Sequence, residues 1–185
     1  KSSSINDDRS LCEFGLIDTN KMTINSLERF DIVTTLFPWD SGDYAQPYNY
    51  DNPSENTPLK TASYKIKRII ALPGETFKID NNELYVLNNN TGIMDHIPMD
   101  FMSHITQENL MNQAETTLAD DEYWVLGDNW GRSSDSSTHK KPVRYENITG
   151  VLIMIQGTCR YQYIDGKDHC VDKKYYSTPR MFKNV

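Results

Sequence analysis

The sequence predicts a mainly β fold, and three observations support this. Short apolar runs, rich in β-branched and aromatic residues, alternate with turns that contain Pro, Gly, Asn or Asp. Tyrosine occurs 11 times, which suits strands better than a bundle of helices. Apolar residues make up 37% of the 185 residues, enough for one domain with a core or for a core that carries a substantial insertion.

The first two predicted strands precede a long loop. Residues 1–13 are polar and irregular, and residues 14–18 form a short strand. A second strand is expected at 30–36, and Pro38 stops it. Residues 39–58 are rich in Tyr, Asn, Asp and Pro and lack a regular period, which predicts a long surface loop.

The next strand, at 64–71, has the most informative pattern. The motif Leu72-Pro73-Gly74-Glu75 ends it, because proline sets the second position of a type II turn and glycine takes the positive φ of the third. Side chains alternate along a strand, so one face should hold Lys65, Lys67, Ile69 and Ala71. A lysine on such a face either covers apolar surface with its stem or is dry enough to act as a base near neutral pH.

The second half of the chain begins with a hairpin, in which 76–79 pairs with 84–87. Residues 88–121 differ in composition, being rich in Asn and Met, and are predicted to be an inserted subdomain. Thr106 is a plausible N-cap for a helix there. The apolar residues at helical spacing are Ile105, Leu110, Met111, Ala114 and Leu118.

The chain ends in further strands. A return to the core is expected at 123–126 and a last strong strand at 151–155, followed by a hairpin with an Asp165-Gly166 turn and a polar end. Cys159 and Cys170 flank that turn. A disulfide across the hairpin, suited to an oxidising exterior, and two free thiols are both open.

Composition and spacing exclude several classes of function. The net charge of −7 argues against nucleic acid as the main partner. The sequence contains no run of about twenty apolar residues, the length needed to span a bilayer. Its polar start, Lys1-Ser2-Ser3-Ser4, shows no cleavable signal peptide. Cys-x-x-Cys pairs and His clusters are missing, so we expect no metal and no cofactor.

Four ordered motifs between residues 29 and 150 resemble type I signal peptidases, which are membrane-anchored serine proteases with a Ser/Lys dyad. The first two are Lys67-Arg68 with Leu72-Pro73-Gly74, and the stretch from Tyr123 through Gly127-Asp128-Asn129 to Ser136. The others keep the family's order: Arg29-Phe30-Asp31-Ile32-Val33 and Glu146-Asn147-Ile148-Thr149-Gly150.

The resemblance implies an antiparallel β catalytic core of signal-peptidase type. This core would comprise residues 1–87 and 122–156, with 88–121 as an inserted smaller cap subdomain and 157–185 as a C-terminal hairpin and tail. The family's membrane helix would lie upstream of Lys1. Residues 1–185 would then lie on the outer face of the cytoplasmic membrane.

By the same resemblance Lys67 is the general base, but the nucleophile motif is a poor match. Counting back from Glu13-Phe14-Gly15 places Ser4 at the nucleophile, with Ile5 in place of the family's Met. Ser2 then falls at a position that helps to bind the oxyanion. A competing register puts the nucleophile just before Lys1, and a third interpretation is a loose polar terminus without a site.

Other positions would support the dyad. Ser133 matches the serine that hydrogen-bonds the lysine amine, and Asp135 belongs to the shell around it; ordinary turn capping is the alternative for both. Trp130 and Ser137 stand where arginines are usual, so Asp135 lacks its expected partner, and Arg132 or Arg144 could substitute for it. Ile66 would line a shallow apolar pocket for substrate. Structural roles are expected for Asp31, Gly127, Asp128 and Asn129, with a positive φ at the glycine.

The predicted function is a serine endopeptidase that removes signal peptides from secreted preproteins. The alternative is a catalytically impaired relative that binds secreted or surface proteins, for example pilin subunits, to assist their assembly. The degenerate serine motif favours the alternative, and the intact Lys67 opposes it. A self-cleaving regulator is disfavoured by the net charge and the single-domain length.

Overall fold

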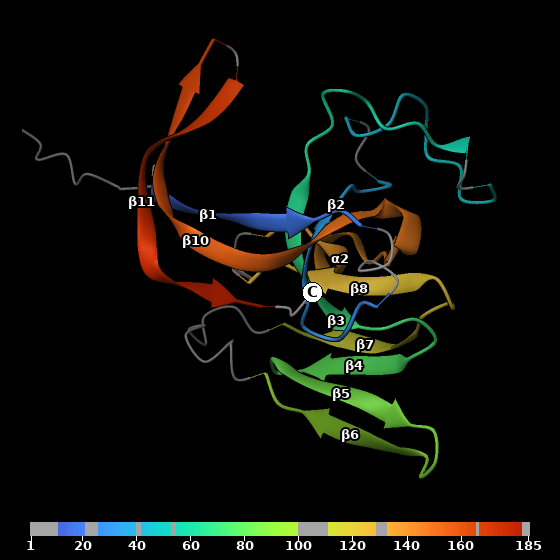
Figure 1. Ribbon diagram of the computed structural model, residues 1–185. Helices are drawn as coiled ribbons and strands as arrows, with labels where there is room; N and C mark the ends of the chain where they lie inside the picture. Colours follow the sequence, from blue (N-terminus) through green and yellow to red (C-terminus); the bar gives the residue numbers. More distant parts are fainter. Residues whose placement is uncertain are drawn as a thin grey trace, which may run out of the picture. The chain divides into compact units, whose positions relative to one another are not determined.

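The computed structural model describes residues 11–20, 26–39, 42–52, 55–99, 111–128, 133–165 and 167–182. Almost all of its regular structure is antiparallel β-strand, which confirms the predicted fold class (Figure 1). The chain forms two compact units, residues 19–151 and residues 1–18 with 152–185. In the described residues no helix is long and apolar enough to cross a membrane.

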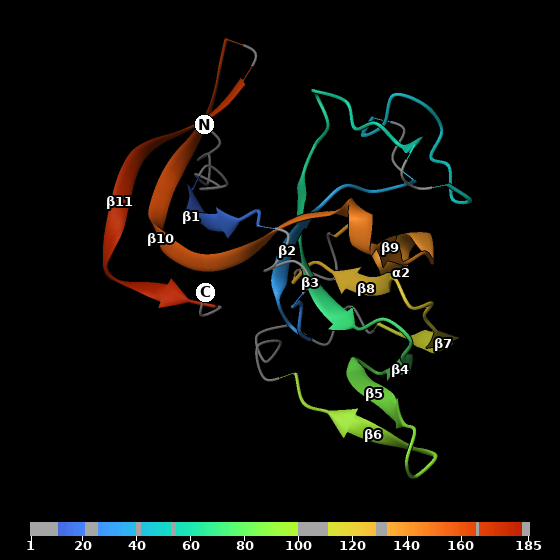
Figure 2. The same cartoon turned by 45° about the vertical axis from the view of Figure 1, so that its right-hand side comes forward.

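The main sheet of the larger unit has the order β10-β2-β3-β8-β9. Its strands are β2 (Ile32–Thr35), β3 (Lys65–Ala71), β8 (Glu122–Leu126), β9 (Val143–Arg144) and the first residues of β10 (Ile148–Ile164). The strand β3 lies between β2 and β8 (Figure 2). A short helix α2 (Ser136–His139) and a 3₁₀ helix η4 (Tyr145–Asn147) connect its later strands.

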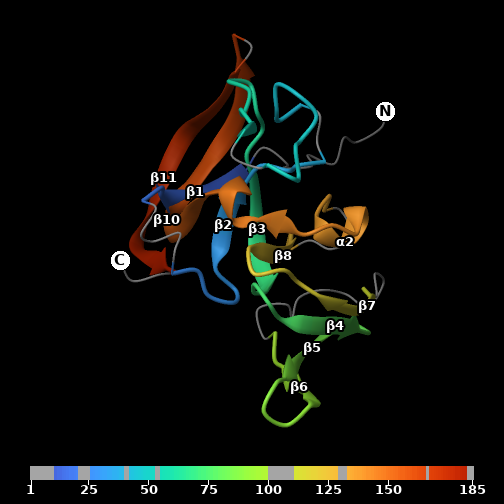
Figure 3. The ribbon, with the colours of Figure 1, turned by 90° about the vertical axis from the view of Figure 1, so that its right-hand side faces the viewer.

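A four-stranded sheet with the order β6-β5-β4-β7 lies past the C-terminal end of β3 (Figure 3). Its strands are β4 (Thr76–Asp80), β5 (Glu83–Asn88), β6 (Ile93–Ile97) and β7 (Gln113–Thr117). The predicted hairpin is confirmed, since Ile79 pairs with Leu84. The predicted inserted subdomain, 88–121, supplies β6 and β7, and these share their sheet with β4 and β5 from the predicted core.

The turn between the two sheets agrees with the sequence. The Glu75 N–H donates to the carbonyl of Leu72 at 3.2 Å, and Gly74 has a φ of 74°. A positive φ at the third position is what a type II turn requires. The prediction that Pro73 and Gly74 end the strand is therefore confirmed.

The predicted helix around Ala114 is wrong in the part that the structure describes. Residues Gln113–Thr117 form β7, in which Thr116 pairs with Phe77 and Thr117 with Thr76. Threonine suits a pleated strand, and the otherwise open edge of β4 supplies the partner. Ile105, Thr106 and Leu110 lie outside the described residues.

The strand β3 has one register irregularity, and its residues pack in two apolar clusters. Its register against β8 shifts between Ile69 and Ala71. Ile69 packs with Val33 in one apolar cluster and Ile70 with Trp124 in the other, as strand alternation requires, but Ala71 joins the cluster of Ile70 and not that of Ile69. The predicted shared face of Lys65, Lys67 and Ile69 thus ends before Ala71, because strict alternation fails at a bulge.

The smaller unit is a long, curved hairpin with an added strand (Figure 1). The strand β11 (Lys167–Met181) pairs antiparallel with β10, and β1 (Leu11–Asp18) is β10's neighbour on the other side. The first strand therefore starts three residues before the prediction. Cys159 and Cys170 form a disulfide across the hairpin, which decides between the two states left open by the sequence.

Candidate active site

The site is built around Lys67 in the first half of β3. Its neighbour in β2 is Val33, and its ammonium reaches back toward the turn that follows β8. There Nζ donates a hydrogen bond of 2.8 Å to Oγ of Ser133. Two residues 66 positions apart are thus brought into direct contact by the pairing of β3 with β8.

Gly127 makes room for this contact. A Cβ atom there would lie 2.2 Å from Ser133 Oγ and 3.3 Å from Lys67 Nζ, so no other residue fits without displacing the serine. The predicted positive φ at this glycine is wrong, because among the described glycines only Gly74 and Gly92 have one. The missing side chain matters here, and the backbone conformation does not.

Asp135 links the turn at Gly127 to the start of α2 through hydrogen bonds to its carboxylate. Its side chain is fully buried, and its carboxylate accepts hydrogen bonds from Gly127 N at 3.0 Å and from Ser137 N and Oγ at 3.1 and 2.7 Å. It is also the N-cap of α2. Ser137 therefore binds this carboxylate, Arg144 donates to the carbonyl of Tyr50, and Arg132 lies outside the described residues.

Asp128 is held by the residue next to Lys67. The Arg68 guanidinium donates to both of its oxygens, at 2.8 and 2.7 Å, and also to the carbonyl of Phe30 at 3.0 Å. Such a two-fold contact is the strong form of an arginine–carboxylate pair. It fixes the turn that begins at Gly127 against the main sheet.

The surroundings of Lys67 lower the pKa of its ammonium. Burial lowers the pKa of this ammonium below its ordinary value. The charge of Lys65 lowers that pKa further, whereas Asp135 and Asp128 act in the opposite direction. Both carboxylates are bound to other donors, and the hydrogen bond of the Lys67 amine goes to the Ser133 hydroxyl.

Comparisons with known proteins identify the family of this chain. The family model described as signal peptidase, peptidase S26, matches residues 2–156. The chain belongs to this family. Signal peptidase I V of Bacillus subtilis (strain 168) is 36% identical over 92 residues, which are 47% of this chain and 54% of the relative. The chain thus spans about half the length of this curated relative.

A solved signal peptidase structure is also similar to the chain. The crystal structure of a signal peptidase I from Enterococcus faecalis V583 matches with a TM-score of 0.45 and 23% sequence identity. The match covers 69% of this chain and 97% of that chain.

Of the remaining residues expected from the signal peptidase resemblance, the structure describes some and leaves others outside its described ranges. Ile66 lies in β3 with its side chain 65% exposed. Asp31 precedes β2, where its carboxylate accepts from Glu28 N at 2.8 Å. Ser2, Ser4 and Asn129 lie outside the described residues. Within the described ranges, no group of three or more His, Cys, Asp or Glu side chains could hold a metal ion.

The structure adds an ion pair that the sequence did not point to. The Lys65 ammonium donates to Oδ2 of Asp43 at 2.5 Å, and the Asp43 side chain is only 1% exposed. Asp43 lies in the long loop after β2, with no periodic pattern around it. A contact across 22 positions from an irregular loop leaves no signal in the sequence.

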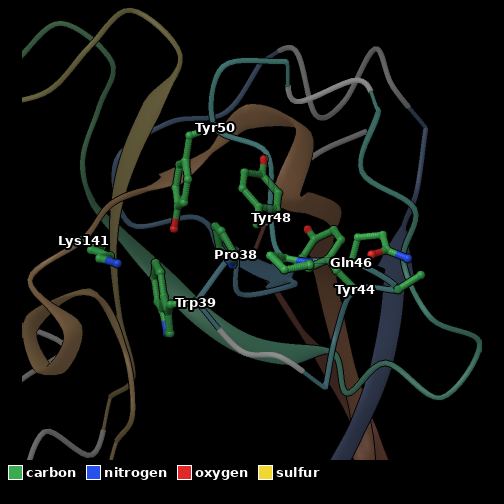
Figure 4. Close-up of a pocket in the computed structure, with 9 residues that line it drawn as sticks. Pro38, Trp39, Tyr44, Gln46, Tyr48, Tyr50 and Lys141 are labelled. Carbon is green, nitrogen blue, oxygen red and sulfur yellow. The ribbon is translucent and has the colours of Figure 1, made fainter.

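The same loop folds into an aromatic pocket of about 490 Å³. The rings of Trp39, Tyr48 and Tyr50 surround it together with Pro38, and Lys141 lies at its side (Figure 4). The Tyr48 hydroxyl also donates a hydrogen bond to Glu146 at 2.5 Å. The described part of the predicted loop therefore forms a pocket and contacts the segment that precedes β10.

Proposed function

We propose that this protein removes signal peptides from secreted preproteins, with Lys67 as the general base of a Ser/Lys dyad. The observation that carries the proposal is the half-buried Lys67 amine, hydrogen-bonded to Ser133 at 2.8 Å and with a lowered pKa. Membership of the signal peptidase family supports the same reaction. Family members are membrane-associated, and we place this region on the outer face of the cytoplasmic membrane, attached through an upstream helix.

In the proposed reaction a serine hydroxyl attacks the carbonyl carbon of the scissile bond while Lys67 takes the hydroxyl proton. Lys67 then returns that proton to the leaving amine, and water hydrolyses the acyl-enzyme. Ser133 orients the amine throughout. The nucleophile stays a prediction, either Ser4 or a serine before Lys1, and Ser2 is the expected oxyanion donor of the first register.

The edge of β3 beside Lys67 supports binding of an extended peptide. The residues Lys65–Arg68 pair with β2 on one side, and on the other side the pairing of β3 with β8 runs from Arg68 to Ala71. We therefore propose that a substrate strand pairs with this edge beside Ile66 and Lys67. A substrate strand added there would gain main-chain hydrogen bonds, and the exposed Ile66 would contact its small side chains.

The test is acyl-enzyme formation by the full-length protein with a signal-peptide substrate, measured by mass spectrometry. Lys67→Ala should abolish it with little change in thermal stability, because a half-buried amine without an anionic partner adds no favourable pairing. The matched control is Lys78→Ala, a lysine that also lies over an aromatic ring but in the four-stranded sheet. Retained cleavage in the Lys67 variant would rule the mechanism out.

Ser4→Ala separates the two nucleophile registers in the same assay. Loss of the acyl-enzyme assigns the nucleophile to Ser4, and unchanged activity moves it upstream of Lys1. Failure of the wild-type protein to form an acyl-enzyme would instead favour the catalytically impaired, protein-binding alternative. The departure of Ile5, Asp7 and Asp8 from the family's nucleophile motif is the observation behind that alternative.

A further inference from the structure

Two ammonium groups share one aromatic ring beside the proposed site. Nζ of Lys65 lies 5.3 Å and Nζ of Lys67 5.7 Å from the centroid of the Phe37 ring. Each cation is attracted to the ring, and like charges repel each other. The two lysines alternate with Ile66 along β3, so the strand itself sets them on one face.

Asp43 is fixed next to this pair by three donors. Its buried carboxylate accepts from Phe37 N at 3.0 Å, Ser63 N at 3.0 Å and Lys65 Nζ at 2.5 Å. A carboxylate that is buried must be neutralised or hydrogen-bonded, and here it is both. Asp43 therefore ties the start of the loop between β2 and β3, at Phe37, to its end, at Ser63 and Lys65.

We infer that Lys65 and Asp43 form a positioning pair for Lys67. Lys65 binds the buried Asp43 carboxylate, and it keeps a second positive charge beside the proposed base. The neutral, proton-accepting form of Lys67 is thereby favoured. The inference rests on the proposed role of Lys67 and assigns to Lys65 a task that packing alone would not give it.

The other charged groups around Lys67 are already engaged. Asp128 is bound by Arg68, and Asp135 by Gly127 N and Ser137. The two carboxylates whose charges act on Lys67, Asp135 and Asp128, therefore each have another donor. An ammonium in a direct ion pair holds its proton firmly, so keeping both carboxylates occupied is what leaves the amine available.

The charge of Lys65 contributes to the lowered pKa of its neighbour Lys67. Burial is the main cause of the lowered pKa of Lys67, and the charge of Lys65 adds to it, against the opposing charge of Asp135. Replacing Lys65 by methionine removes that charge and leaves the Asp43 carboxylate without its cation. Both changes favour the protonated form of Lys67.

The experiment compares four variants of the full-length protein with the wild type: Lys65→Met, Lys65→Arg, the double variant Lys65→Met/Asp43→Asn, and Lys78→Met. The first readout is the titration of Lys67, followed by NMR on protein with ¹³C-labelled lysine and assigned with Lys67→Ala. The second is the pH profile of kcat/KM for a signal-peptide substrate. Lys78, over Tyr85 in the other sheet, is the matched control.

We expect Lys65→Met to move both the Lys67 titration and the acid limb of the profile to higher pH by about one unit. Activity would fall about tenfold on that limb and stay near wild type on the alkaline plateau. Lys65→Arg keeps the cation and should match the wild type, as should Lys78→Met. The double variant should titrate between the wild type and Lys65→Met, because it lacks both the cation and the anion.

An unchanged Lys67 titration in folded Lys65→Met would overturn the inference, and so would an equal loss in Lys65→Met and Lys65→Arg. If Lys65→Met does not fold, the double variant Lys65→Met/Asp43→Asn is used instead. A Lys67 titration in that variant at or below the pH of the wild-type titration would contradict the positioning pair. If the Lys67 titration shifts in Lys65→Met but no variant cleaves the substrate, the positioning pair is supported and the proposed peptidase activity is rejected. If the substrate is cleaved but the Lys67 titration does not shift, the peptidase activity is supported and the positioning pair is rejected.

Discussion

Gly127 is a glycine because two functional atoms occupy the space of its missing side chain. Gly127→Ala would place Cβ against Ser133 Oγ and Lys67 Nζ, and the serine would have to move. We expect acyl-enzyme formation to fall about a hundredfold and the free energy of unfolding to drop by about 1–3 kcal/mol. Gly92→Ala is the control: it meets nothing within 4 Å but has a φ of 71°, so it should cost stability and no activity. Equal activity in both variants would contradict this account.

The lowered pKa of Lys67 also predicts how stability changes with pH. The folded protein binds this proton less tightly than the unfolded chain, so the protonated amine costs stability below the folded pKa. That cost disappears as the pH rises from the folded pKa to the unfolded value of about 10.4. Compared with Lys67→Met, the wild type should therefore gain stability over this window.

Urea denaturation of the two proteins across that range measures the effect. The difference in unfolding free energy between the wild type and Lys67→Met should narrow or reverse in favour of the wild type as the pH rises. A pH-independent difference would show that Lys67 has the same pKa in both states. Only the difference between the proteins matters, because other groups titrate in both.

At the scale of single residues, sequence reasoning reached the motif positions and missed their partners. Lys67 and Ser133 stand in motifs that can be compared along the chain, and the structure brings them together. Asp43 has no such context, because a buried anion in an irregular loop is defined only by the strands that close over it. The reason for Gly127 was also misjudged, since crowding by distant atoms cannot be seen in a local turn pattern.

Among the elements, α2 depends most on one side chain. Asp135→Ala removes its N-cap and leaves the N–H of Gly127 buried without an acceptor. We expect a loss of about 2–4 kcal/mol in the free energy of unfolding, combining a lost cap with an unsatisfied buried donor. Asp135→Asn keeps an acceptor and should lose less. Chemical denaturation checks the order, and equal losses would mean that the hydrogen bonds contribute little.

Strands proved easier to predict than the segment between them. The hairpin of β4 and β5 and the strand β8 follow from local turn and apolar patterns. The strand β7 does not, because its spacing matched a helix and only the open edge of β4 decides its conformation. Pairing across about forty positions overrides a weak local preference.

At the scale of the whole molecule, the disulfide and the candidate site belong to different compact units. The double variant Cys159→Ser/Cys170→Ser opens a loop with a sequence separation of 11 residues. By chain entropy this should cost the hairpin of β10 and β11 about 3 kcal/mol. Hydrogen exchange on the amides of β11 should speed up, whereas the Lys67 titration should stay unchanged. A shifted titration would link the two units.

The bulge in β3 has a consequence for how the larger unit comes apart. Ile69 and Ile70 are adjacent in the chain but pack into different apolar clusters. Unfolding of either sheet would disrupt the packing of β3, which contributes to both apolar clusters. The four-stranded sheet is therefore not a separate foldon. Residues 19–151 should therefore unfold in one cooperative step, and an isolated 76–118 fragment would lack half of its support.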